Sequence, residues 1–417
     1  MSGFARVGGE LTLDAVALAD VAKRFGTPCY VYSRALIEAA FREFDDGLAG
    51  VEHLVCYAVK ANSNLAVLEV LSRLGAGFDI VSGGELARVL AAGGSPDRVI
   101  FSGVGKSVDE IRAALAAGIR CFNVESEPEL ERLDALAGAM GKRAPVSLRI
   151  NPDVDARTHP YISTGMAGNK FGIPHGRAVD AYRHAVRLKN LRITGIGCHI
   201  GSQIIETSPL DEALERVLEL AASLAAEGIA LEHLDLGGGF GIRYKDETPP
   251  DIGGYCRRLA ARLAGRGFEV LLEPGRAIVG NAGALLTRVE YLKLDKARRF
   301  AVVDASMSEL IRPALYQSWH EIVAVAGAAA LVAERYDVVG PVCESSDVLG
   351  TDRNLAIEPG SLLAIMSAGA YGMAMASNYN SRPRPSEILV DAGRALEVRE
   401  RESVESLFAL ERGLGKD

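Results

Sequence analysis

The sequence has no surplus of positive charge. Its 417 residues include 46 Lys and Arg against 54 Asp and Glu, which gives a formal net charge of −8 without any long basic run. A nucleic-acid partner requires a basic footprint, so we expect a small-molecule partner and no nucleic acid. Hydrophobic residues at 48% and charged residues at 24% are typical of a globular protein with a large core. The length predicts two domains, or one barrel with an appended domain.

Paired cysteines and long apolar segments are also missing. Six cysteines occur without any CxxC pair, and most lie in apolar runs, where Cys behaves as a small hydrophobe. We therefore expect neither a disulfide framework nor a structural zinc site. No stretch of 18 apolar residues occurs, and the beginning lacks a cationic stretch followed by an apolar core. These absences predict no membrane contact and a cytoplasmic location.

Common phosphate, dinucleotide and metal motifs are incomplete. SGVGKS (102–107) resembles the end of a P-loop, but Ile100 stands where that loop needs its first glycine. GGGFGI (237–242) is not a dinucleotide fingerprint, because Ile242 replaces the third glycine. No HExxH motif and no calcium-loop spacing occurs. We expect no catalytic metal.

From about residue 50 to residue 280, short β-branched runs alternate with Ala/Leu-rich stretches of helical period. Strict alternation predicts parallel pairing through crossover helices. Eight such units predict an α/β fold, a (β/α)8 TIM-like barrel. The eight predicted strands are LVCYAVK (54–60), GFDIVS (77–82), RVIFSG (98–103), RCFNVE (120–125), PVSLRI (145–150), RITGIGCHI (192–200), LEHLDLG (231–237) and EVLLEP (269–274).

After about residue 280 the pattern changes to period two, with runs such as RRFAVVDAS and SEILVD. This predicts a second, mostly β, C-terminal domain. Helical period returns only at SVESLFALE (403–411). YNSRPRP (379–385) predicts an extended proline-rich segment, to which we assign no chemistry.

Lys60 closes the first predicted barrel strand, at the end where such barrels build active sites. A lysine at the end of an apolar strand is partly desolvated, which makes a neutral amine available for Schiff-base chemistry. Taken alone, a lysine in this position is more often one whose ammonium extends from the barrel mouth into solvent.

Further polar groups follow the later strands. His199 and Ser202 follow the sixth, the glycines of 237–239 follow the seventh, and EPGR (273–276) follows the eighth. Consecutive glycines let backbone N–H groups approach a phosphate, although they also suit a tight turn. An amine, a stacking imidazole, a phosphate-binding loop and a carboxylate together suit pyridoxal 5'-phosphate.

A series of motifs, in order along nearly the whole chain, resembles those of the diaminopimelate decarboxylases. This family belongs to the alanine-racemase-like barrel class (fold-type III) of pyridoxal phosphate enzymes. The resemblance implies a barrel over 26–279, a β domain made from 1–25 and 280–417, and a head-to-tail homodimer with shared active sites. It also implies decarboxylation of meso-2,6-diaminopimelate at its D centre to L-lysine and CO2, the last step of lysine biosynthesis. The motifs are YAVKAN, FDIVSGGEL, HPYISTGMAGNKFGI, GCHIGSQI, LDLGGGFGI, EPGRAIVGNAG, MSELIRPALY, GPVCESSDVLG and GAYGMAMASNYNSRPRP.

The resemblance also assigns roles in cofactor binding. Lys60 matches the lysine that binds the cofactor covalently, and His199 the residue that stacks on its ring. A carboxylate at Glu273 would keep the pyridine nitrogen protonated, so that the ring accepts the electron pair left by CO2. The remaining cofactor positions implied are Asp79, Ser202, Gly238, Gly239, Pro274, Gly275, Arg276 and Tyr371.

The resemblance likewise predicts a pocket for the second amino-acid head of the substrate. Arg276, Arg312 and Tyr316 resemble the side that binds the carboxylate, and Glu344 the side that binds the ammonium. Tyr371 is implied to touch both cofactor and substrate.

Cys343 matches the family's proton donor, which the partner subunit contributes. A thiol suits that role because its pKa is near the working range. Cys343 and Glu344 are therefore predicted to cross the dimer interface together.

Three alternatives stay open at this point. A decarboxylase for ornithine, arginine or carboxynorspermidine would share the fold, but those substrates lack the distal head that Arg312 and Glu344 would bind. A racemase is disfavoured because Glu273 favours a full electron sink. A catalytically inactive regulator would not need to retain Lys60 and Cys343. Asn169 departs from the serine of many relatives, and HPYISTG (159–165) is placed as a lid by position alone.

Overall fold

The computed structural model describes residues 3–155, 170–295, 298–327 and 331–414. The chain forms two compact units. One comprises 1–37, 243–246 and 279–417, and the other comprises 38–242 and 247–278. The helix α2 (Arg34–Gly47) carries the chain from the first unit into the second.

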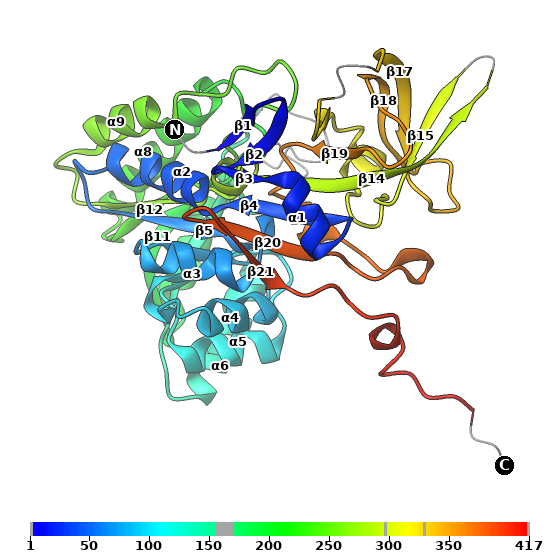
Figure 1. Ribbon diagram of the computed structural model, residues 1–417. Helices are drawn as coiled ribbons and strands as arrows, with labels where there is room; N and C mark the ends of the chain where they lie inside the picture. The colour runs from blue at the N-terminus through cyan, green and yellow to red at the C-terminus, as the bar shows by residue number, and fades with distance from the viewer. Residues whose placement is uncertain (1–2, 156–169, 296–297, 328–330, 415–417) are drawn as a thin grey trace. The chain divides into compact units, whose positions relative to one another are not determined.

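The second unit is a closed barrel of eight parallel strands (Figure 1). Its strand order is β9-β11-β12-β13-β5-β6-β7-β8, and β8 pairs with β9 to close the ring, while β10 (Ile173–Pro174) adds to β9. The eight strands coincide with the eight predicted runs, so the predicted (β/α)8 barrel is confirmed. They are β5 (His53–Ala58), β6 (Gly77–Ile80), β7 (Val99–Phe101), β8 (Cys121–Val124), β9 (Ala144–Asn151), β11 (Leu191–Gly197), β12 (His233–Asp235) and β13 (Glu269–Leu272).

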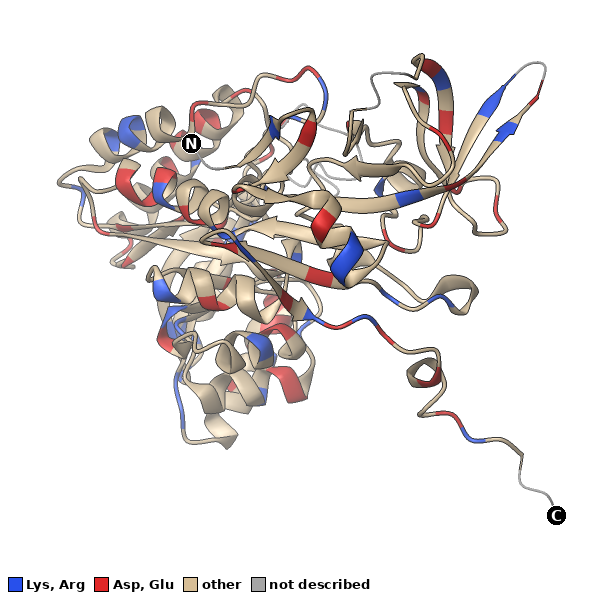
Figure 2. Cartoon of the chain, viewed as in Figure 1, with Lys and Arg blue, Asp and Glu red and all other residues tan. Residues whose placement is uncertain are grey.

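The helices of this unit begin and end where local chemistry favours it. Ser107 and Glu110 form a capping box at the start of α5, and Gly118 ends that helix with a φ of 72°. Both signs of charge occur on the outer helices (Figure 2), as in the pair of Arg183 with Glu227. Besides most of α2, the α-helices of this unit are α3 (Leu65–Arg73), α4 (Gly83–Ala91), α5 (Val108–Ala117), α6 (Glu127–Ala139), α7 (Ala178–Arg187), α8 (Ser208–Ala226), α9 (Ile252–Leu263) and the short α10 (Arg276–Val279).

The barrel interior is apolar in the middle and polar toward the carboxyl ends of the strands. Alternate residues of a strand point to the same side, so the residue two positions after an interior apolar residue also faces inward. Ile100, Cys121 and Leu271 belong to one buried apolar cluster. Ser102, Asn123 and Glu273 follow them by two positions. The strands therefore deliver buried polar groups to one end of the barrel.

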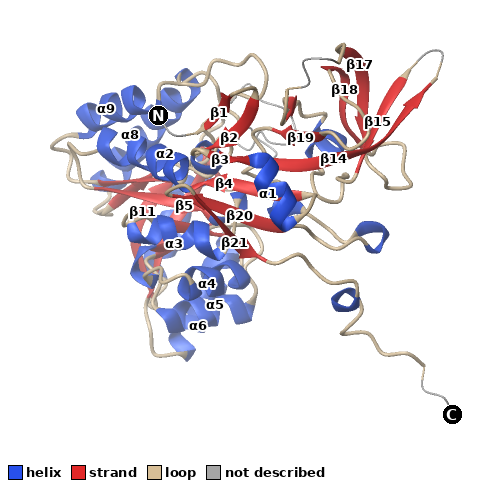
Figure 3. Cartoon of the chain, viewed as in Figure 1, coloured by secondary structure: helices blue, strands red, loops and turns tan. Residues whose placement is uncertain are grey.

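The first unit is mostly β (Figure 3), as predicted. Its large sheet runs β18-β17-β15-β14-β4-β20-β21, with β19 pairing β14 and β16. The unit also contains three N-terminal strands and the helices α1 (Leu18–Phe25) and α11 (Arg312–Tyr316). The strands are β1 (Phe4–Val7), β2 (Glu10–Leu13), β3 (Val16–Ala17), β4 (Cys29–Ser33), β14 (Gly283–Leu294), β15 (Arg299–Val303), β16 (Ile322–Ala324), β17 (Glu334–Val339), β18 (Val348–Leu355), β19 (Leu362–Ile365), β20 (Ser386–Asp391) and β21 (Arg394–Arg399).

The N-terminal segment packs with the C-terminal strands. Leu11 donates a backbone hydrogen bond to Val325, and both residues belong to one buried apolar cluster. The compact unit extends to residue 37, beyond the predicted boundary at 25, because β4 pairs with β14 and β20. The division at 26 and 280 stays a prediction about folding domains.

The helical period predicted at 403–411 is not realised as an α-helix. The segment contains one 3-10 turn, Glu405–Leu407. Phe408 is 54% exposed and Leu410 is 93% exposed. Because Phe408 and Leu410 stay largely exposed, most of the burial that normally stabilises a short helix is missing. In the described residues no helix is long and apolar enough to cross a membrane.

Candidate active site

Lys60 and Asp79 form an ion pair at the carboxyl end of the barrel. Lys60 lies in a 3-10 turn directly after β5, and its Nζ is 2.5 Å from Oδ2 of Asp79 at the end of β6. The Asp79 side chain is fully buried, whereas that of Lys60 is 35% exposed. Burial and the Glu273 carboxylate raise the pKa of Asp79, against the lowering effect of Lys60. The lysine thus has a buried counter-ion and remains reachable from solvent.

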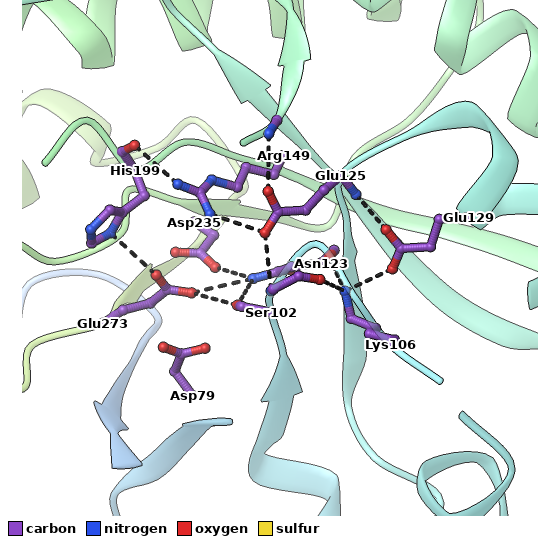
Figure 4. Close-up of polar contacts among 12 residues, drawn as sticks. Asp79, Ser102, Lys106, Asn123, Glu125, Glu129, Arg149, His199, Asp235 and Glu273 are labelled. Carbon is purple, nitrogen blue, oxygen red and sulfur yellow. Dashed lines mark hydrogen bonds and ion pairs between the residues drawn. The ribbon is translucent and has the colours of Figure 1, made fainter. Parts of the chain in front are cut away.

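Glu273 lies beside His199 at the same end of the barrel (Figure 4). Nδ1 of His199 is 3.6 Å from Oε2 of Glu273 and 3.2 Å from the backbone nitrogen of Gly238. Burial alone would raise the pKa of Glu273, but the His199 imidazole and the Lys60 ammonium outweigh it and hold the pKa at about 2. The site therefore offers a buried carboxylate anion next to an imidazole.

The glycine loop after β12 lies directly against neighbouring backbone. A Cβ on Gly238 would be 2.0 Å from the carbonyl oxygen of Glu273, and one on Gly239 would be 2.1 Å from that of Gly201. Gly239 also has a φ of 92°, a conformation that favours glycine. Only glycine therefore lets this loop approach the ends of both flanking strands.

The loop of Glu273 to Arg276 is tied to the same end of the barrel. The carbonyl of Pro274 accepts a hydrogen bond from the backbone nitrogen of Ala58, two residues before Lys60. A Cβ on Gly275 would lie 3.0 Å from the Cβ of Ala58. Buried Arg276 donates to Oγ of Ser202 over 3.0 Å. Ser202 and Arg276 thus present a hydroxyl and a guanidinium together, the donor types that bind a phosphate.

The predicted cofactor residues of the barrel come from the ends of five strands, β5, β6, β11, β12 and β13, that are far apart in sequence. They contribute an amine with a counter-ion, a carboxylate held as an anion, an imidazole, a close-lying glycine loop and an arginine–serine pair. This donor set fits pyridoxal phosphate, which needs a lysine amine, a ring-nitrogen partner and phosphate donors. The residues are Lys60, Asp79, His199, Ser202, Gly238, Gly239, Glu273, Pro274, Gly275 and Arg276.

The other predicted residues lie in the β unit. Arg312 is buried, with its Cζ 5.1 Å from the ring centre of Tyr244 and 5.7 Å from that of Tyr316. Its NH2 donates to Oγ of Ser318 over 3.2 Å. The guanidinium is therefore held between two aromatic rings. Tyr371 has a φ of 55°, a conformation that non-glycine residues adopt rarely and that clusters at functional sites.

Cys343 and Glu344 lie in an exposed turn that YNSRPRP (379–385) supports. The backbone nitrogen of Cys343 donates to Oδ1 of Asn380 over 3.1 Å. Glu344 accepts hydrogen bonds of 2.9 Å from Ser346 and from the hydroxyl of Tyr379, and these bonds lower its pKa. The prediction of an extended segment is wrong for its first three residues, because Tyr379–Ser381 is a 3-10 turn with Asn380 at a φ of 55°, whereas Arg382 after it is extended. The hydrogen bonds to the 340s turn stabilise that shape.

Sequence reasoning missed a buried polar layer beneath the site. Asp235, Asn123 and Ser102 lie at most 7% exposed inside the barrel (Figure 4). Lys106, in the P-loop-like stretch, pairs instead with Glu129 over 2.7 Å, both being buried. The available signal was a single polar residue near the end of an apolar strand, as in LDLG, CFNVE and IFSG.

Residues 159–165 and Asn169 lie outside the described residues.

The comparisons with known proteins agree with this site. Residues 34–280 match the family model of the pyridoxal binding domain of pyridoxal-dependent decarboxylases. The chain belongs to this class of enzymes.

Closer relatives define the family within the class. The chain is 58% identical to a diaminopimelate decarboxylase of Pseudomonas aeruginosa over 409 residues, 98% of each protein. A crystal structure of the Helicobacter pylori diaminopimelate decarboxylase complexed with L-lysine is 42% identical, with a TM-score of 0.91 over 94% of this chain and 99% of that one. A crystal structure of the diaminopimelate decarboxylase from M. jannaschii in co-complex with L-lysine is 36% identical, with a TM-score of 0.93 over 99% of this chain and 98% of that one. The chain therefore belongs to the diaminopimelate decarboxylase family.

Proposed function

We propose that this chain decarboxylates meso-2,6-diaminopimelate at its D centre with pyridoxal 5'-phosphate and releases L-lysine and CO2, the last step of lysine biosynthesis. The observation that carries the proposal is the pair of Lys60 with Asp79 beside the buried anion Glu273. The 58% identity to a diaminopimelate decarboxylase and the L-lysine bound in two similar structures support the substrate.

The barrel residues take the cofactor roles in this proposal. Lys60 would hold the cofactor covalently through its amine, and Asp79 is the counter-ion of that amine. The bound cofactor supplies an electron sink for the pair left when CO2 departs. Glu273, which its pKa of about 2 keeps anionic, would hold a proton on the ring nitrogen. His199 would pack on the ring, while Ser202, Arg276 and the glycine loop would bind the phosphate.

Residues of the β unit recognise the substrate and supply the proton for the reacting carbon. Arg312, with Tyr316 and Arg276, binds the distal carboxylate, and Glu344 binds the distal ammonium. Support comes from the buried, aromatic-flanked guanidinium of Arg312 and from the lowered pKa of Glu344. Tyr371 touches both cofactor and substrate. Cys343 returns a proton to the reacting carbon.

The proposal includes assembly and location. The protein is a cytoplasmic homodimer in which Cys343 and Glu344 cross into the partner's site. The exposure of both residues supports this arrangement, since neither is buried within its own chain.

Product analysis tests the proposal. The purified protein with added pyridoxal phosphate receives meso-diaminopimelate, ornithine, arginine and carboxynorspermidine separately. We expect lysine from the first and no product from the others. An amine product from any other substrate would contradict the proposed substrate pocket but not the class of enzyme. The absence of product from all four substrates would favour a catalytically inactive regulator. Arg312→Leu should raise KM for meso-diaminopimelate, while Arg335→Leu, at an exposed surface ion pair with Asp352, is the matched control.

A further inference from the structure

Three carboxyl groups lie buried together at the carboxyl end of the barrel. Asp79, Asp235 and Glu273 are 0%, 2% and 7% exposed. Asp79 has Lys60 as an ion-pair partner, and Glu273 has His199 nearby. Within the part of the chain that the structure describes, no Lys, Arg or His nitrogen is within 4 Å of an Asp235 oxygen. Asp235 thus lacks the compensation that its two neighbours have.

One side-chain nitrogen connects Asp235 to Glu273 (Figure 4). Nδ2 of Asn123 is 2.9 Å from Oδ2 of Asp235 and 3.3 Å from Oε1 of Glu273. It is also 3.1 Å from Oγ of Ser102, which donates to the same Glu273 oxygen over 3.3 Å. The two carboxyl groups are therefore adjacent.

Two adjacent buried carboxyl groups do not both ionise, because each charge disfavours the other. Burial and the Glu273 charge raise the pKa of Asp235 well above its ordinary value, whereas that of Glu273 is lowered to about 2. Oδ1 of Asp235 accepts the backbone N–H of Gly237 over 2.9 Å. Oδ2 accepts from Nδ2 of Asn123 over 2.9 Å, and the same nitrogen lies 3.3 Å from Oε1 of Glu273. Oδ2 is therefore the oxygen on the side of Glu273, and as a hydroxyl it can accept from Asn123 and still donate its own proton.

We propose that Asp235 is a neutral carboxylic acid that donates a hydrogen bond to Glu273 and so keeps Glu273 an anion. This inference deepens the proposed function and rests on it, since the Glu273 anion is the group assigned to the ring nitrogen of the cofactor. Asp235 touches Glu273 and not the ring, so it is a positioning residue. Its proton stays on Oδ2 throughout the reaction.

The cysteine thiols near Asp235 carry no charge that could compete with Glu273. The thiols of Cys56, Cys121 and Cys198 are buried, and burial raises the pKa of each, to about 12 for Cys121 and Cys198. They remain neutral at working pH. Asp79 and Glu273 are the acidic neighbours, and Lys60 and His199 are the basic groups at the same barrel end.

Infrared spectroscopy of the cofactor-free protein tests the protonation state directly. With 13C-labelled aspartate carboxyls, the wild-type minus Asp235→Asn difference spectrum at neutral pH should show the C=O stretch of a protonated acid. Asp109→Asn, at a side chain that is 95% exposed, is the control and should remove only an ionised carboxylate signal. Loss of an ionised carboxylate signal in Asp235→Asn would overturn the proposal. This result does not depend on which substrate the enzyme accepts.

Kinetics test whether the donor matters. Asp235→Asn keeps a donor, because its side-chain NH2 group can donate to Glu273 in place of the acid proton. Asp235→Ala removes the donor, so kcat should fall about 10- to 100-fold, the usual effect of losing a hydrogen-bonded supporting group. The acid limb of its pH profile should move to higher pH, while Asp235→Asn stays near wild type.

Cys56→Ala controls for lost volume in the barrel interior. Equal losses in Asp235→Ala and Asp235→Asn, or an unmoved pH profile in both, would overturn the proposed donor role. If the wild type decarboxylates none of the substrates, the proposed function fails while the infrared result still decides the protonation state of Asp235.

Discussion

Replacing Lys106 with methionine should destabilise the barrel strongly, although Lys106 lies outside the proposed chemistry. Its side chain is 1% exposed, and Nζ donates to Glu129 and to the carbonyls of Gly103 and Asn123 over 2.7, 2.7 and 2.8 Å. Lys106→Met keeps most of the volume but leaves the buried Glu129 carboxylate without its cation. Breaking a buried pair in this way costs about 3–5 kcal/mol.

A double-mutant cycle separates the ion pair from the packing. Glu129→Gln should also destabilise, because it leaves the ammonium unpaired, and the double variant should lose less than the sum of the two by about 2–3 kcal/mol. The Glu129 carboxylate accepts a hydrogen bond from the backbone nitrogen of Glu125 over 2.8 Å. A glutamine at position 129 can still accept this bond, so Glu129→Gln removes the charge alone.

The assay is urea unfolding of the cofactor-free protein followed by far-UV circular dichroism. Arg112→Met, which removes an exposed pair with Asp109 at 3.7 Å, is the surface control and should cost less than about 1 kcal/mol. A free energy of unfolding for Lys106→Met within about 1 kcal/mol of the wild-type value would refute the reasoning. A double variant that loses the full sum of the two single-variant losses would refute it as well.

Three further predictions concern the site and the barrel. When the protein is treated with pyridoxal phosphate and borohydride, mass spectrometry should find a covalent pyridoxyl group on the wild type and none on Lys60→Ala. Labelling of the variant would mean that another lysine binds the cofactor. Cys343→Ala should bind cofactor normally but turn over more slowly by orders of magnitude, and an unchanged kcat would move the proton donor elsewhere. Burial and the charges of Arg120 and Arg192 lower the pKa of His233 to about 3, so the unfolded chain binds its proton first as pH falls. Stability should therefore drop between about pH 6.5 and 3 by up to about 1.4 kcal/mol per pH unit, and His233→Gln should lessen that slope in acid unfolding curves.

The eight barrel strands were predictable because each is a local pattern. β-branched runs alternate with helical periods, and capping residues such as Ser107 mark helix starts in the sequence itself. Lys60 and Glu273 were found for a related reason, since each follows a strand end directly. A resemblance along nearly the whole chain then supplied roles that no single motif carries.

Segments whose structure depends on distant partners were not predictable in the same way. SVESLFALE has helical period, but its apolar residues Phe408 and Leu410 remain largely exposed, and only one 3-10 turn forms. YNSRPRP bends because Tyr379 and Asn380 hydrogen-bond to the turn of Glu344 and Cys343, about 35 residues earlier. Such contacts have no trace in local composition.

The sequence by itself determined the number and order of strands, the barrel and the residues at the strand ends, because periodicity and strand direction are local properties. Tertiary structure alone decided how the charges of those residues are distributed. Asp79, Asp235 and Glu273 are equivalent acids in the sequence, but burial and neighbours leave Glu273 an anion and raise the pKa of the other two. The physical reason is that an ionisation state depends on distances and on exclusion of water, and both arise only when strands from distant parts of the chain close into one barrel.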